Sequence, residues 1–249
     1  MDEIERWRVE KKERVCFVTF NYDTMLEEAM RHVLRLGVRD MSSYIKWENY
    51  SLFKLHGSVD WGRVIEGINA GGRGGPMAFY EHIVNTVRPD NSSVSQNYER
   101  CTLDMSPNPN TGATLFPAIS IPVENKDEFS CPSGHIEVLK EMLPKVTKLI
   151  TIGWRATEDK FLEMLQDSRS VIIDGIRNPV NLLIVSGTQQ GAELTAKNLG
   201  RFGDDPSLPR RGSGSLINEA LLGQREFVPT GFTGLINNLD TLRVFLRSK

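Results

Sequence analysis

Short apolar, β-rich runs alternate along this chain with segments in which apolar residues recur at helical spacing. The clearest runs cover residues 15–20, 50–58, 146–152 and 181–187. Runs of this length with few polar interruptions are typical of strands buried within a parallel sheet. We therefore predict four parallel strands at these places.

The segments between the runs predict helices that pack on the sheet. The clearest covers residues 24–36, where the apolar residues lie on one face. They are Met25, Leu26, Ala29, Met30, Val33, Leu34 and Leu36. Further helices are predicted at residues 135–143, 189–199 and 232–246, and an amphipathic helix follows the 146–152 strand after a glycine turn. Alternating strands and helices favour an α/β fold with parallel strand pairing.

Residues 62–113 interrupt this alternation, and the apolar signal returns at residues 115–122. The interruption has loop composition, including a glycine tract at residues 70–76. Because a structureless connection of this length is unusual within a compact domain, we predict a small loop-rich insertion or lid. The glycine tract lacks a following Lys-Ser or Lys-Thr pair, which favours a flexible loop over a phosphate site. Residues 201–214 are also predicted to be a loop.

Length and composition fit one α/β domain. The chain has 249 residues, 39% of them apolar and 25% charged, enough for one sizeable core. A net charge of −2 gives no electrostatic case for nucleic acid or an anionic membrane. No apolar stretch approaches the ~20 residues that span a bilayer. Residues 1–13 are charged and do not resemble a signal peptide, so we expect a cytoplasmic protein.

Cysteine and histidine spacing predicts no metal site. Cys16, Cys101 and Cys131 are far apart and odd in number, which excludes a Cys-x-x-Cys zinc motif and a disulfide framework. The other candidate ligands are His32, His82 and His135, and each lacks a partner at ligand spacing. We expect these three histidines to be surface residues or satisfied core residues.

Polar residues stand at the ends of three predicted strands. Asn21 and Asp23 follow the first strand, His56 and a glycine end the second, and Gly153 follows the third. In open α/β sheets, ligands bind just beyond the carboxyl ends of the strands. Histidine is also the side chain whose ordinary pKa lies nearest neutrality. These strand ends therefore predict a ligand site.

The amino-acid sequences and the order of three motifs at these strand ends resemble those of the sirtuin-like family. The motifs are Thr-Phe-Asn-Tyr-Asp at residues 19–23, Lys-Leu-His-Gly-Ser at 54–58 and Ile-Gly-Trp-Arg-x-x-Glu-Asp at 152–159. The first is similar to that of the bacterial-type members, and the similarity spans residues 14–247. It implies a single domain over residues 1–249, with a three-layer Rossmann-like parallel sheet and a smaller loop-rich module inserted over the cleft.

The resemblance also implies an NAD site and assigns its residues. Asn21 would lie beside the nicotinamide ribose and hold a water or a ribose hydroxyl. Asp23 would accept hydrogen bonds from the nicotinamide carboxamide, and its charge would stabilise the cationic centre as the nicotinamide bond breaks. His56 would be the general base on a ribose hydroxyl or on water.

The remaining assignments concern the other half of NAD. Thr19 would supply a hydroxyl near the phosphates or the ribose. Gly153 and Trp154 would border the adenosine, and Ser186 would be a further adenosine contact. No metal is implied, and NAD is the substrate.

The residues taken alone leave structural alternatives open. Asn21 and Asp23 fit caps for the helix that follows them, and His56 fits a packed histidine. Trp61 and Trp154 fit core or pocket-wall positions. Thr157, Glu158 and Asp159 fit the cap and first turn of a helix.

The chain departs from the family pattern in two ways. It lacks the four zinc cysteines of the deacylase members, and no Gly-x-Gly precedes Asn21. In the family, an opening strand carries such a loop for the pyrophosphate. We therefore expect either an N-terminally truncated piece of a longer chain with additional domains, or a reduced relative completed by another chain. A missing strand would leave a sheet edge uncovered, so we expect association into a homo-oligomer.

Three functions remain open. The first is an NAD hydrolase with water as acceptor, as in bacterial-type members that act in anti-phage defence. The second is an NAD-dependent protein deacylase, which the missing zinc module disfavours. The third is a non-catalytic nucleotide-binding or structural module, which the missing phosphate loop favours.

Overall fold

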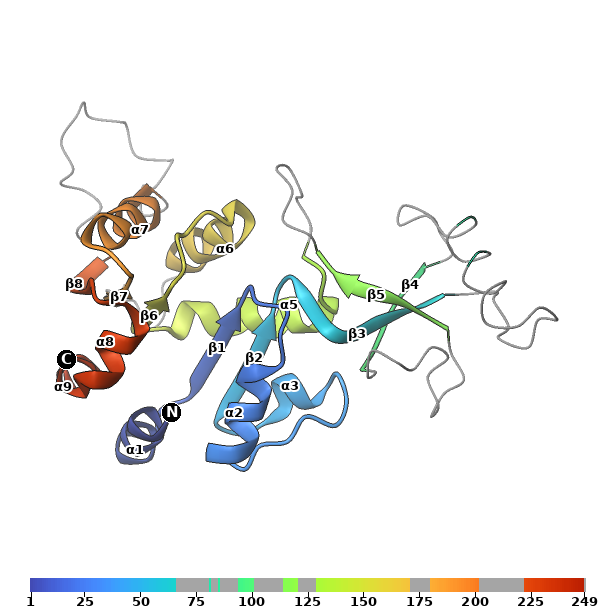
Figure 1. The fold of residues 1–249 in the computed structure, drawn as a ribbon, viewed down its shortest axis with the longest axis horizontal. Coiled ribbons are helices and arrows are strands. Elements are labelled where there is room, and N and C mark those ends of the chain that lie inside the picture. The colour runs from blue at the N-terminus through green and yellow to red at the C-terminus, as the bar shows by residue number, and fades with distance from the viewer. Residues whose placement is uncertain are drawn as a thin grey trace. The chain divides into compact units, whose positions relative to one another are not determined.

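The computed structural model describes residues 1–65, 81, 85, 94–100, 114–120, 129–170, 180–201 and 222–248. The chain divides into two compact units (Figure 1). Unit 1 consists of residue 1 and residues 12–138, and unit 2 of residues 2–11 and 139–249.

Unit 1 begins with two parallel strands, β1 (Val15–Thr19) and β2 (Tyr50–Lys54). Helices α2 (Met25–Val33) and α3 (Ser43–Lys46) lie in the connection between them. Parallel strands need a crossover of this kind, because the second strand must start at the same end as the first. The carboxyl ends of β1 and β2 therefore lie at the same edge.

A three-stranded antiparallel sheet follows in unit 1, with the order β4-β3-β5. Its strands are β3 (Gly57–Ile65), β4 (Val94–Arg100) and β5 (Leu115–Ile119). The chain turns at Leu55 and His56, directly after β2. The single run predicted at residues 50–58 was therefore wrong in extent, because this turn divides it between β2 and β3.

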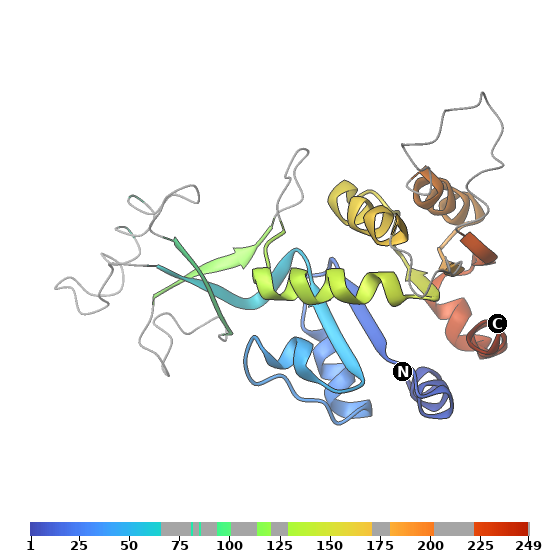
Figure 2. The same ribbon diagram turned by 180° about the vertical axis from the view of Figure 1, so that it is seen from behind.

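The core of unit 1 lies around β2 and β3. Its fully buried side chains include Met30, Tyr44, Leu52, Phe53, Leu55 and Trp61. The first half of helix α5 (Ser133–Met142) joins this core through His135, whose ring contacts Tyr44, Phe53 and Trp61. Helix α2 and this half of α5 lie on opposite faces of the β1–β2 pair (Figures 1 and 2).

Unit 2 contains a parallel sheet with the order β6-β7-β8. Its strands are β6 (Lys148–Ile152), β7 (Val180–Val185) and β8 (Leu222–Val228), and a short 3₁₀ helix, η1 (Leu143–Lys145), precedes β6. All six residues of β7 are buried. A central strand has helices on both faces, which explains why its sequence is apolar throughout.

Helices cover both faces of the unit 2 sheet. Helices α6 (Asp159–Ser170) and α7 (Gln189–Arg201) pack on one face, and α1 (Asp2–Lys11), α8 (Gly231–Asn237) and α9 (Leu239–Arg247) on the other. The first core cluster contains Ala156, Leu162, Val180, Leu182, Ile184, Ala192, Ala196 and Leu199. The second contains Leu183, Val185, Val228, Leu235, Leu242, Phe245 and Leu246. Alternate side chains of β7 therefore pack into the two core clusters on opposite faces of the sheet.

The sequence pattern located most of these elements. The α/β class is confirmed, as are the strands within residues 15–20, 146–152 and 181–187. The prediction of one helix over residues 232–246 was wrong, because the helix is interrupted at Asn238 and the segment forms α8 and α9. The charged N-terminal segment, for which no element was predicted, forms α1.

Two predicted loops fall largely outside the described residues. The insertion at residues 62–113 is described at the end of β3, at β4 and at residues 81 and 85, and the glycine tract lies outside. Of residues 201–214, only 201 is described, as the last residue of α7. None of the helices in the described ranges is long and apolar enough to cross a membrane.

Candidate functional site

The ends of β1 and β2 form a corner in unit 1. Thr19 is the register partner of Lys54, and the backbone N–H of Leu55 donates to the Thr19 carbonyl at 3.1 Å. One turn later, the N–H of Val59 donates to the carbonyl of Tyr22 at 2.9 Å. These bonds place the loop that follows β1 beside the turn that follows β2.

His56 lies in this corner and contacts aromatic rings of the β1 loop. Its ring centroid is 5.1 Å from that of Phe20 and 6.4 Å from that of Tyr22. The Tyr22 hydroxyl donates to the Ser120 carbonyl at 2.8 Å, and the Ser120 N–H donates to the His56 carbonyl at 2.9 Å. The imidazole is half-buried. The packed position predicted as the alternative for His56 is therefore present, and part of the ring remains exposed.

Gly57 is required where it stands. Its φ is +85°, and a Cβ at this position would lie 1.8 Å from the carbonyl oxygen of Ala118. Only glycine fits such a left-handed conformation with backbone so close. The glycine thus allows β3 to start directly after His56.

The side chains of Asn21 and Asp23 are exposed at the same corner. The backbone N–H of Asn21 donates to Oγ1 of Thr19 at 3.1 Å, and Oδ1 of Asp23 accepts from the N–H of Met25 at 3.0 Å. Asp23 therefore bonds the first amide of α2 from the position before the N-cap residue, Thr24, which agrees with the capping alternative for Asp23. An exposed carboxylate with one oxygen on a helix amide is held in place and still faces solvent.

A buried ion pair lies beneath the corner, and the sequence analysis missed it. Lys54 is 0% exposed, Glu27 is 5% exposed, and Nζ of Lys54 lies 2.9 Å from Oε1 of Glu27. The ammonium also donates to the carbonyls of Tyr22 and Asp23. Two patterns could have revealed the pair: a lysine inside an apolar strand, and a glutamate three positions before the buried Met30 on α2. By contrast, the apolar Met25 and Val33 of that helix are exposed.

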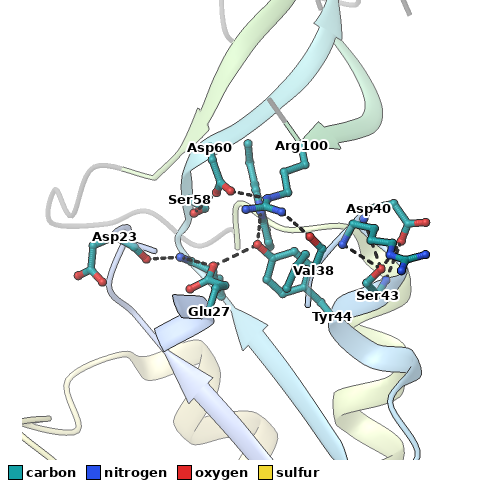
Figure 3. Close-up of polar contacts among 12 residues, drawn as sticks. Asp23, Glu27, Val38, Asp40, Ser43, Tyr44, Ser58, Asp60 and Arg100 are labelled. Atoms are coloured by element: carbon teal, nitrogen blue, oxygen red, sulfur yellow. Dashed lines mark hydrogen bonds and ion pairs between the residues drawn. The ribbon is translucent and has the colours of Figure 1, made fainter. Parts of the chain in front are cut away.

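Further polar residues extend this network (Figure 3). Oε1 of Glu27 accepts from the Tyr44 hydroxyl at 3.1 Å, and that hydroxyl accepts from Nε1 of Trp61 at 3.0 Å. Burial, followed by the charges of Glu27 and Asp60, raises the pKa of Tyr44. The phenol is thus a neutral hydrogen-bonding group that orients the Glu27 carboxylate.

A second ion pair borders the network. Nε of Arg100 lies 2.6 Å from Oδ2 of Asp60, and the guanidinium also donates to the carbonyl of Val38. Oδ1 of Asp60 accepts from the Ser58 hydroxyl at 2.6 Å. The same hydroxyl lies 3.1 Å from the Tyr22 carbonyl, so this pair also reaches the β1 loop.

The adenosine candidates lie in unit 2, at the carboxyl edge of its own sheet. The Gly153 N–H donates to the Val185 carbonyl at 3.0 Å, and the Ser186 N–H donates to the Val228 carbonyl at 3.0 Å. Gly153 is exposed with a φ of +65°, and Ser186 is half-buried. The structure thus brings Gly153 and Ser186 to the ends of neighbouring strands.

The tryptophans occupy core positions, as the structural alternative predicted. Trp61 is 2% exposed. Trp154 is half-buried, packs on the first core cluster of unit 2, and donates from Nε1 to Glu158. Glu158 also accepts from the N–H of Thr157 at 3.2 Å, just before α6 begins at Asp159. This amide precedes the helix, so the bond does not test the capping interpretation, whereas Asp159 lies in the first turn of α6 as the dipole interpretation predicted.

His32 has the expected surface position, whereas His135 is a core residue whose Nδ1 has no hydrogen-bond partner within the described part of the chain. His32 is exposed on α2, beside Glu28. His135 is buried, and its Nε2 lies 2.8 Å from the Met41 carbonyl. Burial lowers the pKa of His135, and this effect exceeds the smaller, opposing effect of the Met41 bond. His82 and Cys101 lie outside the described residues.

No group of His, Cys, Asp and Glu in the described ranges is placed to hold a metal ion. Comparisons of the chain with models of protein families, with curated proteins and with solved structures found no match. Any function of the chain must therefore be inferred from its own residues. Unit 1 offers an amide, a carboxylate and an imidazole on adjoining strand ends.

Proposed function

We propose that the chain binds NAD and hydrolyses its nicotinamide–ribose bond, with water as the acceptor. The observation that carries the proposal is the meeting of two segments far apart in sequence. The loop with Asn21 and Asp23 and the turn with His56 lie together at the carboxyl ends of β1 and β2. Ligands of open α/β sheets bind at such ends.

The proposed reaction assigns a task to each of the three side chains. The nicotinamide nitrogen leaves with the electron pair of its bond to the ribose, and the ribose becomes cationic. Asp23 stabilises this charge and binds the carboxamide, while Asn21 holds the attacking water. The water oxygen bonds to the ribose carbon as His56 accepts its proton. The products are nicotinamide and ADP-ribose.

The other residues implied by the resemblance belong to the same proposal. Thr19 would contact the phosphates or ribose, and Gly153, Trp154 and Ser186 the adenosine. The finer fold is proposed with them: the parallel strands belong to a three-layer Rossmann-like sheet of the sirtuin-like type. We place the activity in the bacterial cytoplasm, in defence against phage.

A non-catalytic nucleotide-binding module is the second candidate. Two observations favour it: Oδ1 of Asp23 caps the first amide of α2, and His56 packs between aromatic rings. Both side chains then serve the fold, and NAD would bind without turnover.

Nicotinamide release by the purified chain tests the proposal. We expect release that does not depend on an acyl-lysine peptide, and a 10²- to 10⁴-fold loss of rate in His56→Ala, the usual contribution of a general base. The matched control is His32→Ala, because His32 is exposed on α2. Release that requires the peptide would identify a deacylase. NAD binding without release, unchanged by His56→Ala, would identify the non-catalytic module.

A further inference from the structure

Lys54 is a buried cation of unit 1, and the oxygens around it accept hydrogen bonds from its ammonium group. Three oxygens surround Nζ: the carbonyls of Tyr22 and Asp23 and Oε1 of Glu27. The side chain is 0% exposed. An ammonium is costly to bury unless it is paired and hydrogen-bonded, and here the carboxylate and both carbonyls meet that need.

Two of these oxygens belong to consecutive peptide groups. The Tyr22 carbonyl belongs to the peptide before Asp23, and the Asp23 carbonyl to the peptide after it. One ammonium therefore fixes the peptide planes on both sides of the Asp23 Cα. Because these planes set φ and ψ of Asp23, they also set the direction in which its side chain leaves the backbone.

Other donors support the same loop. The Tyr22 carbonyl also accepts from the Val59 N–H at 2.9 Å, and the Ser58 hydroxyl, which donates to Asp60, lies 3.1 Å from it. Glu27 holds the ammonium from α2, one turn after Asp23. In Figure 3 the Asp23 carboxylate points away from Glu27, while the Asp23 carbonyl faces the network. The buried contacts thus hold the backbone and leave the carboxylate outside.

We propose that Lys54 is a positioning residue that aims the Asp23 carboxylate, and with it the Asn21 loop, for cleavage of NAD. This inference rests on the proposed function. Lys54 is too deeply buried to contact a substrate and acts through the two carbonyls. A carboxylate stabilises a developing charge only when it is held in the correct place, and small displacements cost large factors in rate.

Removing Lys54 alone would leave the Glu27 carboxylate buried and unpaired, and this variant could fail to fold. The double variant Lys54→Met/Glu27→Gln avoids that problem. It removes both charges, fills similar volume, and keeps an oxygen at position 27 for the Tyr44 hydroxyl. It loses the ammonium contacts to the Tyr22 and Asp23 carbonyls.

Arg63→Met is the matched control. Arg63 also donates to two backbone carbonyls in unit 1, those of Val94 and Ser95, at 3.2 and 2.9 Å. These contacts hold β4, not the β1 loop. A general loss of cation–carbonyl bonds would therefore affect both variants, whereas mispositioning of Asp23 affects only the double variant.

Three measurements are made on each protein: urea unfolding, hydrogen exchange of the peptide over residues 20–25, and kcat and KM for nicotinamide release. In the double variant we expect exchange over residues 20–25 to be at least about tenfold faster, with exchange in β7 unchanged. We also expect kcat to fall 10- to 100-fold, with KM within about threefold of wild type. Arg63→Met should match wild type in kcat and in this peptide.

Each outcome decides between the proposals. Unchanged exchange at residues 20–25, or unchanged kcat in a double variant that folds, overturns the role of Lys54. If the wild-type protein releases no nicotinamide, the proposed function fails, and the exchange result still decides whether Lys54 holds the loop. Faster exchange throughout the protein would show a general structural role and would also overturn the inference.

Discussion

At the scale of residues, a few buried polar side chains determine the charge and hydrogen bonding inside the core of unit 1. Lys54 and Glu27 neutralise each other inside the core, and Tyr44 and Trp61 extend the hydrogen bonds of that pair from Oε1 of Glu27. His135 is different, because it is buried among aromatic rings and its Nε2 lies beside the Met41 carbonyl. A buried neutral imidazole makes the stability of the fold sensitive to pH.

We predict that the free energy of unfolding decreases as the pH decreases, because of His135. The folded pKa of His135 lies below its ordinary value, so in the interval between the two the unfolded chain binds a proton that the folded protein does not. The stabilisation is complete above about pH 6.5 and is lost as the pH falls towards the folded pKa, with a slope of up to about 1.4 kcal/mol per pH unit.

Urea unfolding between pH 7.5 and 5 measures this slope. His135→Gln keeps an N–H donor and does not titrate, so its free energy of unfolding should depend less on pH than that of the wild type. The control is His32→Gln, at an exposed position of α2. Equal slopes in His135→Gln and the wild type would contradict the prediction.

At the scale of elements, a local cap decides whether a periodic apolar pattern forms one helix or two. Asn238 has φ −134° and ψ 82°, which no helix residue adopts, and its side chain accepts from the N–H of Asp240 at 3.3 Å. Its backbone N–H donates to the Gly234 carbonyl, which ends α8. The residue thus terminates one helix and starts the next.

We predict that Asn238→Ala lowers the free energy of unfolding by about 1 kcal/mol, the usual cost of a lost N-cap. The neighbouring Asn237→Ala is the control, because Asn237 is an exposed helix residue of α8 where alanine is well tolerated. Urea denaturation compares the two variants. If Asn238→Ala is no less stable than Asn237→Ala, the cap contributes nothing.

At the scale of the whole molecule, each parallel sheet has edge strands. Within the described residues, β1 pairs with β2 alone, and β6 pairs with β7 alone. Strand β6 begins with a lysine, Lys148, a residue that protects natural edge strands, whereas β1 has no such residue. Strand β1 has no charged residue, and all five of its residues are half-buried. Because Thr19 accepts from β2, the backbone groups of its neighbour Val18 face the other edge.

We predict that the edge of β1 pairs with another copy of the chain in purified protein. Sedimentation velocity at micromolar concentration should show a species larger than the monomer. Val18→Lys should shift it towards the monomer, because an edge lysine opposes strand addition. Val244→Lys, at an exposed position of α9, is the control. A wild-type monomer at these concentrations would contradict the prediction.

The candidate site was partly predictable from sequence. The strand ends that carry Asn21, His56 and Gly153 followed from apolar runs and the polar residues after them. The bond from the first amide of α2 to Asp23 also followed, because it joins residues two positions apart. The Lys54–Glu27 pair did not follow, because its partners are 27 positions apart and each breaks the apolar pattern of its own element.

The sequence by itself determined the α/β class, most of the strand and helix positions, and which polar residues stand at strand ends. These features depend on local periodicity and on capping, which are properties of neighbouring residues. Tertiary structure alone decided that the turn with His56 packs on Phe20 and Tyr22, and that Lys54 holds both carbonyls around Asp23. Such contacts depend on the register of β1 with β2 and on the face that α2 presents, and no local pattern specifies either.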